Sequence, residues 1–475
     1  MQALKRGEKN NMKKEEQLAK NTAILTVGTL FTKILAFIVI PLFSSWLSVS
    51  DYGKYDLYNT YITLLIPILT LSCGEAVFRF LLDTNENIKR KSIVSSAFFV
   101  ALLGIFIGAF IVPSLMIENT PIKIAFLLLM VFEILNNFLQ AYIRGLKKLK
   151  YYAISSIIVM IFGTVFVTVF VFFLNMELQG ILLGYALAYL ISCIYLIVSG
   201  KFFKYISLKS ISKKEIQNIL YYSMPLIPNT ISWWIMNVSD RSIIKLWLGS
   251  NVLGIYSIAC TLPSVCTTLF GVFQFSWQQS VSETIEDKDK EIFYSKVLNK
   301  LIMVTSSIAI AVLSVNFIFF KFIFDPKYID GYWSVGILMA ATVLSSIAAY
   351  FGGIFIGQKN TKHNGATTAI TALINVVVHL SLVKFIGIYA ASVSTFVSYL
   401  ALVIIRVKII NRTIKLKIDN ETKCVILILT YYCIIQYFPN TILELINVLV
   451  ASIIFLYVNK NTLIGILKKL NIYKK

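Results

Sequence analysis

Stretches of about 20 consecutive apolar residues recur along the whole chain, and they restrict the fold more than any other feature of the sequence. The hydrocarbon core of a bilayer is about 30 Å thick, so a helix that crosses it needs roughly that many apolar residues. Only 14% of the 475 residues are charged and 57% are hydrophobic, whereas about 25% are charged in soluble domains. The sequence therefore predicts an all-α polytopic membrane protein with about 14 transmembrane helices.

The expected spans lie between clusters of charged or turn-forming residues. The first is expected to stay in the protein, because its apolar run is longer than that of a cleaved signal peptide. We predict the spans at residues 22–45, 57–82, 92–117, 122–143, 151–174, 178–199, 219–248, 252–282, 297–324, 332–357, 364–386, 387–411, 422–438 and 441–458.

Basic residues are distributed unevenly between the two sides of this predicted topology. Of the 44 Lys and Arg residues, 35 fall on one side, 7 on the other, and 2 within helices. Cytoplasmic segments of membrane proteins carry the excess of basic residues. We therefore expect a multi-pass membrane protein with both termini in the cytoplasm.

The net charge of +21 comes from short loops beside apolar helices, where Lys and Arg set topology and contact lipid headgroups. Membrane lipid is therefore the expected partner, and nucleic acid is not. The six cysteines have no metal-ligand spacing, and the chain has no nucleotide-binding fingerprint. The predicted outer loops have about ten residues or fewer, whereas a membrane glycan polymerase or ligase would need a substantial one. The sequence therefore predicts no enzymatic activity and no cofactor.

An internal repeat indicates two related halves. Tyr52-Gly53-Lys54-Tyr55 resembles Leu253-Gly254-Ile255-Tyr256, and Gly180-Ile181 matches Gly387-Ile388 at nearly the same offset. We therefore predict an N-lobe of six helices at 1–215, a C-lobe of six helices at 216–415, and two additional helices with a basic tail at 416–475. An even number of helices in each half makes the repeat parallel, so a substrate site is expected between the lobes.

Charged and polar residues inside the predicted spans mark candidate functional positions, because an ionisable group at bilayer depth costs several kcal/mol. Lys33 lies near the midplane, roughly 15 Å from either interface, which favours a cavity-lining role over snorkelling. Glu133 begins a polar stripe on one face of its helix. The stripe either supplies interhelical hydrogen bonds or lines a cavity whose carboxylate binds a proton or cation. Its other members are Asn136, Asn137, Gln140 and Arg144.

Other intramembrane polar residues allow two interpretations each. Glu75 and Arg79 are one helical turn apart and either neutralise each other or contact a ligand. His379 is interpreted as a hydrogen-bonded interior histidine, with a proton relay as the alternative. In span 219–248, Pro225 and Pro228 provide either a hinge or a static kink. The same span carries a polar stripe that ends near the outer face, namely Asn229, Trp233, Asn237, Asp240, Arg241 and Lys245.

Four segments resemble the Wzx-type polysaccharide-biosynthesis flippases, which belong to the multidrug/oligosaccharidyl-lipid/polysaccharide (MOP) exporter superfamily. The resemblance covers essentially the whole chain and rests on the order and spacing of loose motifs. The segments are Gly28-Thr29-Leu30-Phe31-Thr32-Lys33-Ile34-Leu35, Asp51-Tyr52-Gly53-Lys54-Tyr55, Gly74-Glu75-Ala76-Val77-Phe78-Arg79 and Ser239-Asp240-Arg241-Ser242-Ile243-Ile244 with Leu248-Gly249.

The resemblance implies a two-lobed bundle that flips a polyprenyl-diphosphate-linked oligosaccharide from the cytoplasmic to the outer leaflet, coupled to H+ or Na+. It implies a cationic substrate cavity with Lys33, Arg79, Arg241 and Lys245, and coupling or cavity-wall roles for Glu133, Asn136, Asn137, Gln140, Glu75, Asn237 and Asp240. A glycan polymerase and glycosyltransferases of the same pathway are the expected protein partners. The alternatives are an ion-coupled drug or cation antiporter of the same superfamily and a membrane glycan polymerase or ligase.

Overall fold

The computed structural model describes residues 39–116, 118–284, 289–358, 360–438 and 441–472. Every regular element among these residues is helical, which confirms the all-α fold. The chain divides into two compact units, Met1–Ile231 (the N-terminal unit) and Ser232–Lys475 (the C-terminal unit). The predicted lobes at 1–215 and 216–415, with 416–475 appended, stay a prediction.

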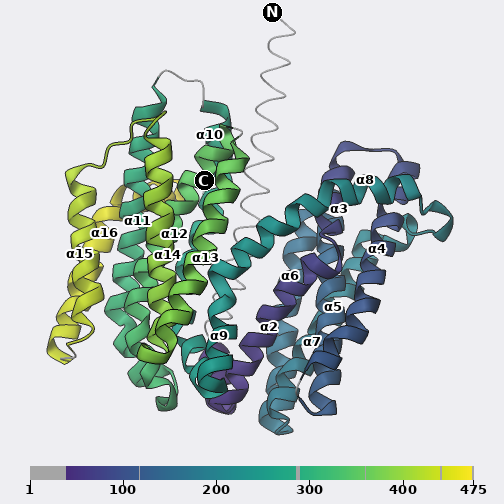
Figure 1. The fold of residues 1–475 in the computed structure, drawn as a ribbon, viewed down its shortest axis with the longest axis horizontal. Helices are drawn as coiled ribbons and strands as arrows, with labels where there is room; N and C mark the ends of the chain where they lie inside the picture. The colour runs from purple at the N-terminus through teal and green to yellow at the C-terminus, as the bar shows by residue number, and fades with distance from the viewer. Residues whose placement is uncertain (1–38, 117, 285–288, 359, 439–440, 473–475) are drawn as a thin grey trace, which may run out of the picture. The chain divides into compact units, whose positions relative to one another are not determined.

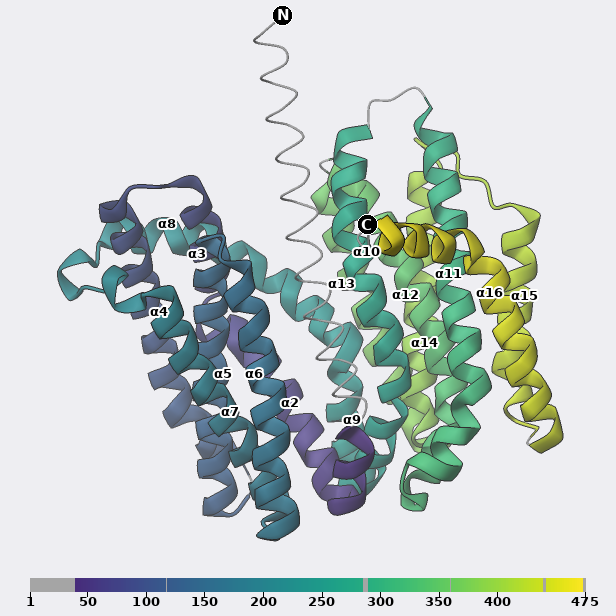
Figure 2. The same cartoon turned by 180° about the vertical axis from the view of Figure 1, so that it is seen from behind.

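The described part of the N-terminal unit is a helical bundle in which α4 to α7 run side by side (Figures 1 and 2). A π-helical turn, Thr168–Phe173, extends α6, and two short 3-10 turns connect α7 to α8. The helices are α2 (Val49–Leu69), α3 (Cys73–Asp83), α4 (Asn87–Leu115), α5 (Thr120–Gly145), α6 (Leu149–Val167), α7 (Glu177–Gly200) and α8 (Lys213–Ser223).

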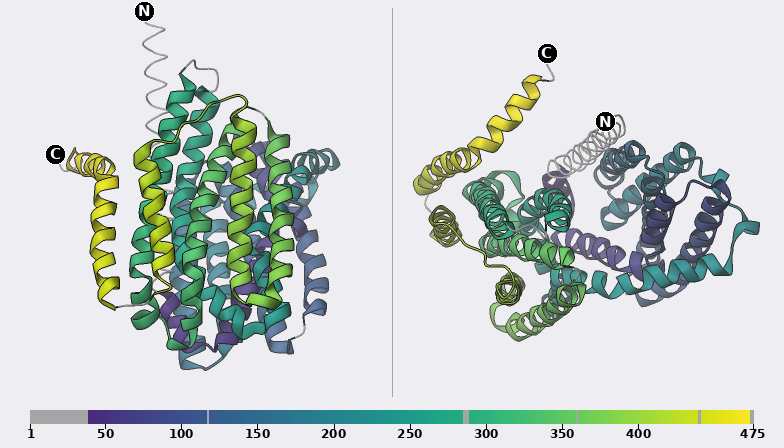
Figure 3. Two further views of the ribbon diagram at one scale, coloured as in Figure 1. Left: turned by 60° about the vertical axis from the view of Figure 1, so that its left-hand side comes forward. Right: turned by 90° about the horizontal axis from the view of Figure 1, so that it is seen from above.

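The C-terminal unit is a second bundle, whose first helix begins in the last residues of the N-terminal unit. The C-terminal part of its last helix turns away from the direction of the first part (Figure 3). The helices are α9 (Ile227–Ala259), α10 (Thr261–Thr284), α11 (Lys290–Ile318), α12 (Tyr332–Gly357), α13 (Thr361–Ile386), α14 (Tyr389–Ile410), α15 (Asn420–Ile435) and α16 (Thr441–Ile472).

The described helices include ten that are long and apolar enough to cross a membrane, or eleven if the bent pair α2–α3 is one span. Each predicted span from the second to the fourteenth contains a helix, and residues 22–38 of the first lie outside the described residues. Helix α10 and the 16-residue α15 are not among the ten. The multi-pass membrane architecture is confirmed, and the total of fourteen spans stays a prediction.

A break divides the span that the sequence predicts as one continuous helix at 57–82. Helices α2 and α3 are bent by 58° at this break, where Leu71 and Ser72 adopt φ angles of 48° and 53°. The left-handed region is strained for residues other than glycine. A Cβ at Gly104 in α4 would lie 1.8 Å from the Leu69 carbonyl oxygen. The backbone of α4 therefore packs directly against the break, and the prediction of a continuous helix is wrong here.

Proline and glycine set the ends of the long first part of α9. Pro225 lies in a 3-10 turn, Met224–Leu226, that separates α9 from α8. Gly249 has a φ of 87° and interrupts the helix, in agreement with the predicted end of the span at 248. The predicted start at 219 is wrong, because residues 219–223 belong to α8.

Arg406 is a basic residue within the predicted span at 387–411. It lies in α14 with its side chain fully buried. Its Nη1 donates to the Ala348 carbonyl at 2.6 Å, and its Nη2 donates to Asn364 Oδ1 at 2.7 Å and to Thr368 Oγ1 at 2.9 Å. These neutral acceptors belong to α12 and α13, so one guanidinium group joins three helices.

The orientation predicts which loops react with a membrane-impermeant thiol reagent in intact cells. In a background without the six native cysteines, single cysteines at Asn119, Asn251 and Asn440 should be labelled from outside. Cysteines at Asn87, Asn218 and Asn360 should be labelled only after the membrane is opened, which provides the control for expression. Labelling of either set in the opposite pattern would contradict the fourteen-span topology.

Candidate functional site

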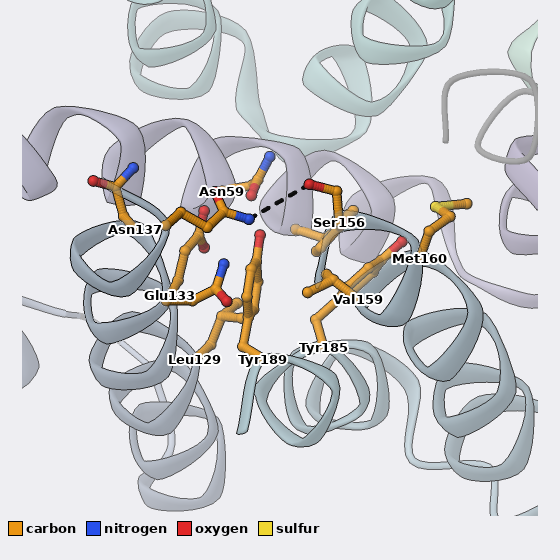
Figure 4. A pocket seen from close by; sticks show the side chains of 12 residues that line it. Asn59, Leu129, Glu133, Asn137, Ser156, Val159, Met160, Tyr185 and Tyr189 are labelled. Carbon is orange, nitrogen blue, oxygen red and sulfur yellow. Dashed lines mark hydrogen bonds between the residues drawn. The ribbon is translucent and has the colours of Figure 1, made fainter. Parts of the chain in front are cut away.

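A polar cavity of about 380 Å³ lies within the N-terminal unit, among helices that are otherwise mostly apolar (Figure 4). Its walls come from α2, α5, α6 and α7. Four of its polar residues belong to the stripe on α5, and the remainder come from the three other helices. The polar lining residues are Tyr55, Asn59, Glu133, Asn136, Asn137, Gln140, Ser156, Tyr185 and Tyr189.

The structure brings the first four members of the α5 stripe together at this cavity. Asn136 is buried and its Oδ1 accepts a hydrogen bond of 2.7 Å from Ser192 Oγ. Gln140 Nε2 donates to Ser155 Oγ at 3.1 Å and, at 3.4 Å, to Ser156 Oγ. Two members of the stripe thus hold α5 against α6 and α7, and all four line the cavity. Their role in coupling stays a prediction.

Glu133 lies at the midpoint of α5 with its carboxylate only partly compensated. The Tyr189 hydroxyl is directed at this carboxylate (Figure 4) and is its hydrogen-bond partner. The buried Oε2 atom has no hydrogen-bond partner among the described residues. None of the described lining residues is a lysine or an arginine. A carboxylate so placed is suited to binding a proton or a small cation, because burial of an uncompensated ion is costly.

Tyrosines form an aromatic wall that the sequence reasoning missed. The rings of Tyr55 and Tyr185 stack with their centroids 5.7 Å apart and an interplanar angle of 11°. Gly163 in α6 makes room for this arrangement, since a Cβ there would lie 2.8 Å from Tyr185 Cε1. The spacing of Tyr185 and Tyr189, one helical turn apart in a span without charges, was the available signal.

Glu75 and Arg79 do not pair with each other, so mutual neutralisation, one of the two interpretations of these residues, is wrong. Arg79 pairs with Asp83 at 3.0 Å, and Glu75 pairs with Arg144 at 3.5 Å. The Arg144 guanidinium also lies 5.0 Å from the centroid of the Phe78 ring. Arg144 therefore joins the end of α5 to α3 and is not part of the cavity lining. A ligand-binding role for Arg79 stays a prediction, and Lys33 lies outside the described residues.

From Asn237 to Lys245, the polar stripe on α9 lies in the C-terminal unit and is hydrogen-bonded there. Asp240 Oδ1 accepts from the Arg241 backbone N–H at 2.8 Å and from its Nη1 at 3.3 Å, and Oδ2 accepts from the Tyr256 hydroxyl. Asn237 Oδ1 accepts from the Tyr399 hydroxyl at 2.5 Å. Lys245 donates to Ser250 Oγ. These contacts stabilise the unit, and substrate or coupling roles for these residues stay predictions.

His379 in α13 departs from its expected state. Its side chain is fully buried, and neither ring nitrogen has a hydrogen-bond partner among the described residues. Asp240 is the charged group that acts on it electrostatically. The interpretation of His379 as a hydrogen-bonded interior histidine is therefore wrong.

The two helical bundles have the fold of MOP superfamily transporters. The structure is similar to an inward-facing multidrug resistance MATE family transporter of that superfamily, with a TM-score of 0.67, 12% identity, and coverage of 82% of this chain and 99% of that chain. It is equally similar to the lipid II flippase MurJ in an inward closed conformation, with a TM-score of 0.67, 15% identity, and coverage of 94% and 100%.

The sequence then defines the family within this fold. A sequence model described as polysaccharide biosynthesis protein matches residues 18–274, and the chain belongs to this family. Lsg locus putative protein 1 of Haemophilus influenzae is 23% identical to this chain, in an alignment that covers 52% of this chain and 61% of that relative. An uncharacterized membrane protein of Methanocaldococcus jannaschii is 20% identical over 98% of both chains.

Proposed function

We propose that this protein flips a polyprenyl-diphosphate-linked oligosaccharide from the cytoplasmic to the outer leaflet by alternating access, for the synthesis of a capsule, O-antigen or exopolysaccharide. The observation that carries the proposal is membership of a polysaccharide biosynthesis family by a chain built of membrane helices around a polar cavity. A polar cavity among membrane helices suits a step of polysaccharide synthesis that takes a polar, lipid-linked precursor across the membrane.

The physical problem of this step is the head group. A diphosphate and a hydrated saccharide cannot enter hydrocarbon without losing hydrogen bonds and ion solvation worth many kcal/mol. Polar side chains inside a membrane protein replace that water, while the polyprenyl tail stays in lipid. The cavity in the N-terminal unit provides such an environment for part of the head group.

We assign the diphosphate to the basic residues and coupling to the acidic ones. Lys33, Arg79, Arg241 and Lys245 would bind the phosphate oxygens, with Lys33 acting as a point charge that lacks the paired geometry of arginine. Coupling to H+ or Na+ would use Glu133, supported by its neighbours on α5 and by Asn237, Asp240 and Glu75. The protein would work in the bacterial cytoplasmic membrane beside a glycan polymerase and glycosyltransferases, with both termini in the cytoplasm.

One observation favours a second candidate, an ion-coupled antiporter for drugs or other cations. The described lining of the cavity contains a carboxylate and no lysine or arginine, which suits a cationic ligand. Lipophilic cations distinguish the two. If they are transported and polyprenyl-linked saccharides are not, the antiporter is correct.

Lys33 provides the direct test of the flippase. In a strain that lacks its own flippase, Lys33→Ala should be expressed at the normal level but show little surface glycan, with lipid-linked precursor retained in the cytoplasmic leaflet. Lys33→Arg should keep much of the export, because it keeps the charge. Normal export by Lys33→Ala at wild-type expression would contradict diphosphate binding by this residue.

A further inference from the structure

Several polar groups of the cavity in the N-terminal unit are not used by the protein itself. The side chains of Asn59 and Asn137 line the cavity and have no hydrogen bond to any described residue. Glu133 Oε2 also has no hydrogen-bond partner in the described part of the chain. Two free amides each offer two donor hydrogens and an acceptor oxygen. The cavity therefore provides hydrogen-bonding capacity that a hydroxyl-rich ligand would satisfy.

The charge of the lining restricts which part of a lipid-linked saccharide fits here. A diphosphate is normally bound by Arg or Lys side chains, and the described lining has neither. A carboxylate would instead repel phosphate and accept hydrogen bonds from hydroxyl or amide N–H groups. The cavity therefore suits the sugar rather than the diphosphate.

The aromatic wall adds the second element of sugar recognition. Tyr55 and Tyr185 are fixed by their mutual stacking, and Tyr185 is also confined by the close approach at Gly163. A flat aromatic surface packs against the apolar C–H face of a pyranose ring, while the surrounding amides bind the hydroxyls at its edge. The volume of about 380 Å³ lies at the small end of the range for ligand pockets, about 300–1,000 Å³. The cavity therefore accommodates a single sugar ring rather than a whole oligosaccharide.

We infer that this cavity is a subsite for one sugar ring of the transported lipid, with the sugar lying against the aromatic wall of Tyr55 and Tyr185 and with Asn59 and Asn137 binding its hydroxyl or acetamido groups. The inference rests on the proposed function, because it takes a lipid-linked saccharide as the substrate. It adds that selection among saccharides occurs at this cavity and is separable from binding of the polyprenyl diphosphate.

The test compares lipids with and without a sugar on the purified full-length protein in lipid nanodiscs. The probes are polyprenyl diphosphate and the same lipid carrying glucose, galactose or N-acetylglucosamine. The wild type should bind at least one sugar-bearing lipid about tenfold more tightly than the bare lipid, which corresponds to one or two net hydrogen bonds. Asn137→Ala and Tyr185→Ala should reduce this ratio to about one.

Binding of the bare lipid controls for folding, since both variants should bind it with wild-type affinity. Tyr185→Phe keeps the ring and should retain most of the ratio. Tyr221→Ala, at an exposed tyrosine of α8, is the matched control and should leave the ratio unchanged.

The outcomes separate the two proposals. If the wild type binds the bare lipid but no sugar increases its affinity, or if the ratio survives in both alanine variants, the sugar subsite is wrong and the flippase stands. If the wild type binds none of the lipids, the proposed function fails and the subsite fails with it.

Discussion

Glu133→Gln should abolish transport driven by an ion gradient while leaving the protein folded. Glutamine keeps the shape of the side chain and the hydrogen bond with Tyr189, but it cannot exchange a proton or bind Na+ through a charge. One coupled proton in a gradient of one pH unit supplies about 1.4 kcal/mol, so the wild type should reach up to about tenfold unequal distribution of substrate. The variant should reach equal distribution in both pH and Na+ gradients.

The measurement uses proteoliposomes and a fluorescent polyprenyl-diphosphate saccharide that a quencher reaches from only one side. Exchange of labelled for unlabelled substrate without a gradient should continue in Glu133→Gln, which shows that the binding site is intact. Glu86→Gln, at an exposed glutamate of the same unit, is the matched control. Full gradient-driven accumulation by Glu133→Gln would make the α5 stripe a packing element only.

Arg406→Ala should have the largest effect on the stability of the C-terminal unit. The substitution leaves the Ala348 carbonyl, Asn364 and Thr368 without their donor and opens a cavity among α12, α13 and α14. Unsatisfied buried acceptors cost about 1–3 kcal/mol, and the cavity adds to this. We expect a loss of about 3 kcal/mol and an unfolding temperature lower by roughly 10 °C.

Arg412→Ala provides the matched control, because Arg412 is an exposed arginine six residues after Arg406. Thermal unfolding of the purified proteins is measured in one detergent, in which Arg412→Ala should unfold at the wild-type temperature. Arg406→Lys should be intermediate, since lysine keeps the charge but cannot reach acceptors on two helices at once. Equal melting of Arg406→Ala and Arg412→Ala would show that the three helices are held together by apolar packing alone.

Features that depend on local periodicity could be predicted from the sequence. The span at 332–357 coincides with α12, because its length and its ends follow from apolar content and charge alone. Glu133, Asn136 and Gln140 meet at one cavity because helical spacing puts them on one face. In both cases the residues that carry the signal are neighbours along one helix.

Features that depend on contacts between helices could not be predicted from the sequence. Glu75 pairs with Arg144 because α3 approaches α5, whereas the Arg79–Asp83 pair lies within α3. The burial of Arg406 depends on neutral acceptors on α12 and α13, far away in the sequence. The tyrosines of the cavity resemble ordinary membrane aromatics until α2, α6 and α7 bring their rings together.

The break between α2 and α3 also bears on how the protein enters the membrane. Lipid offers no hydrogen bonds, so irregular backbone at this depth is stable only where protein covers it. At Leu69 the backbone of α4 at Gly104 provides this cover, and the ribosome synthesises Gly104 later than the residues of the break. We therefore expect α2, α3 and α4 to reach their final form as a group during biogenesis, and a larger side chain at position 104 to impair assembly of the bundle before any substrate is met.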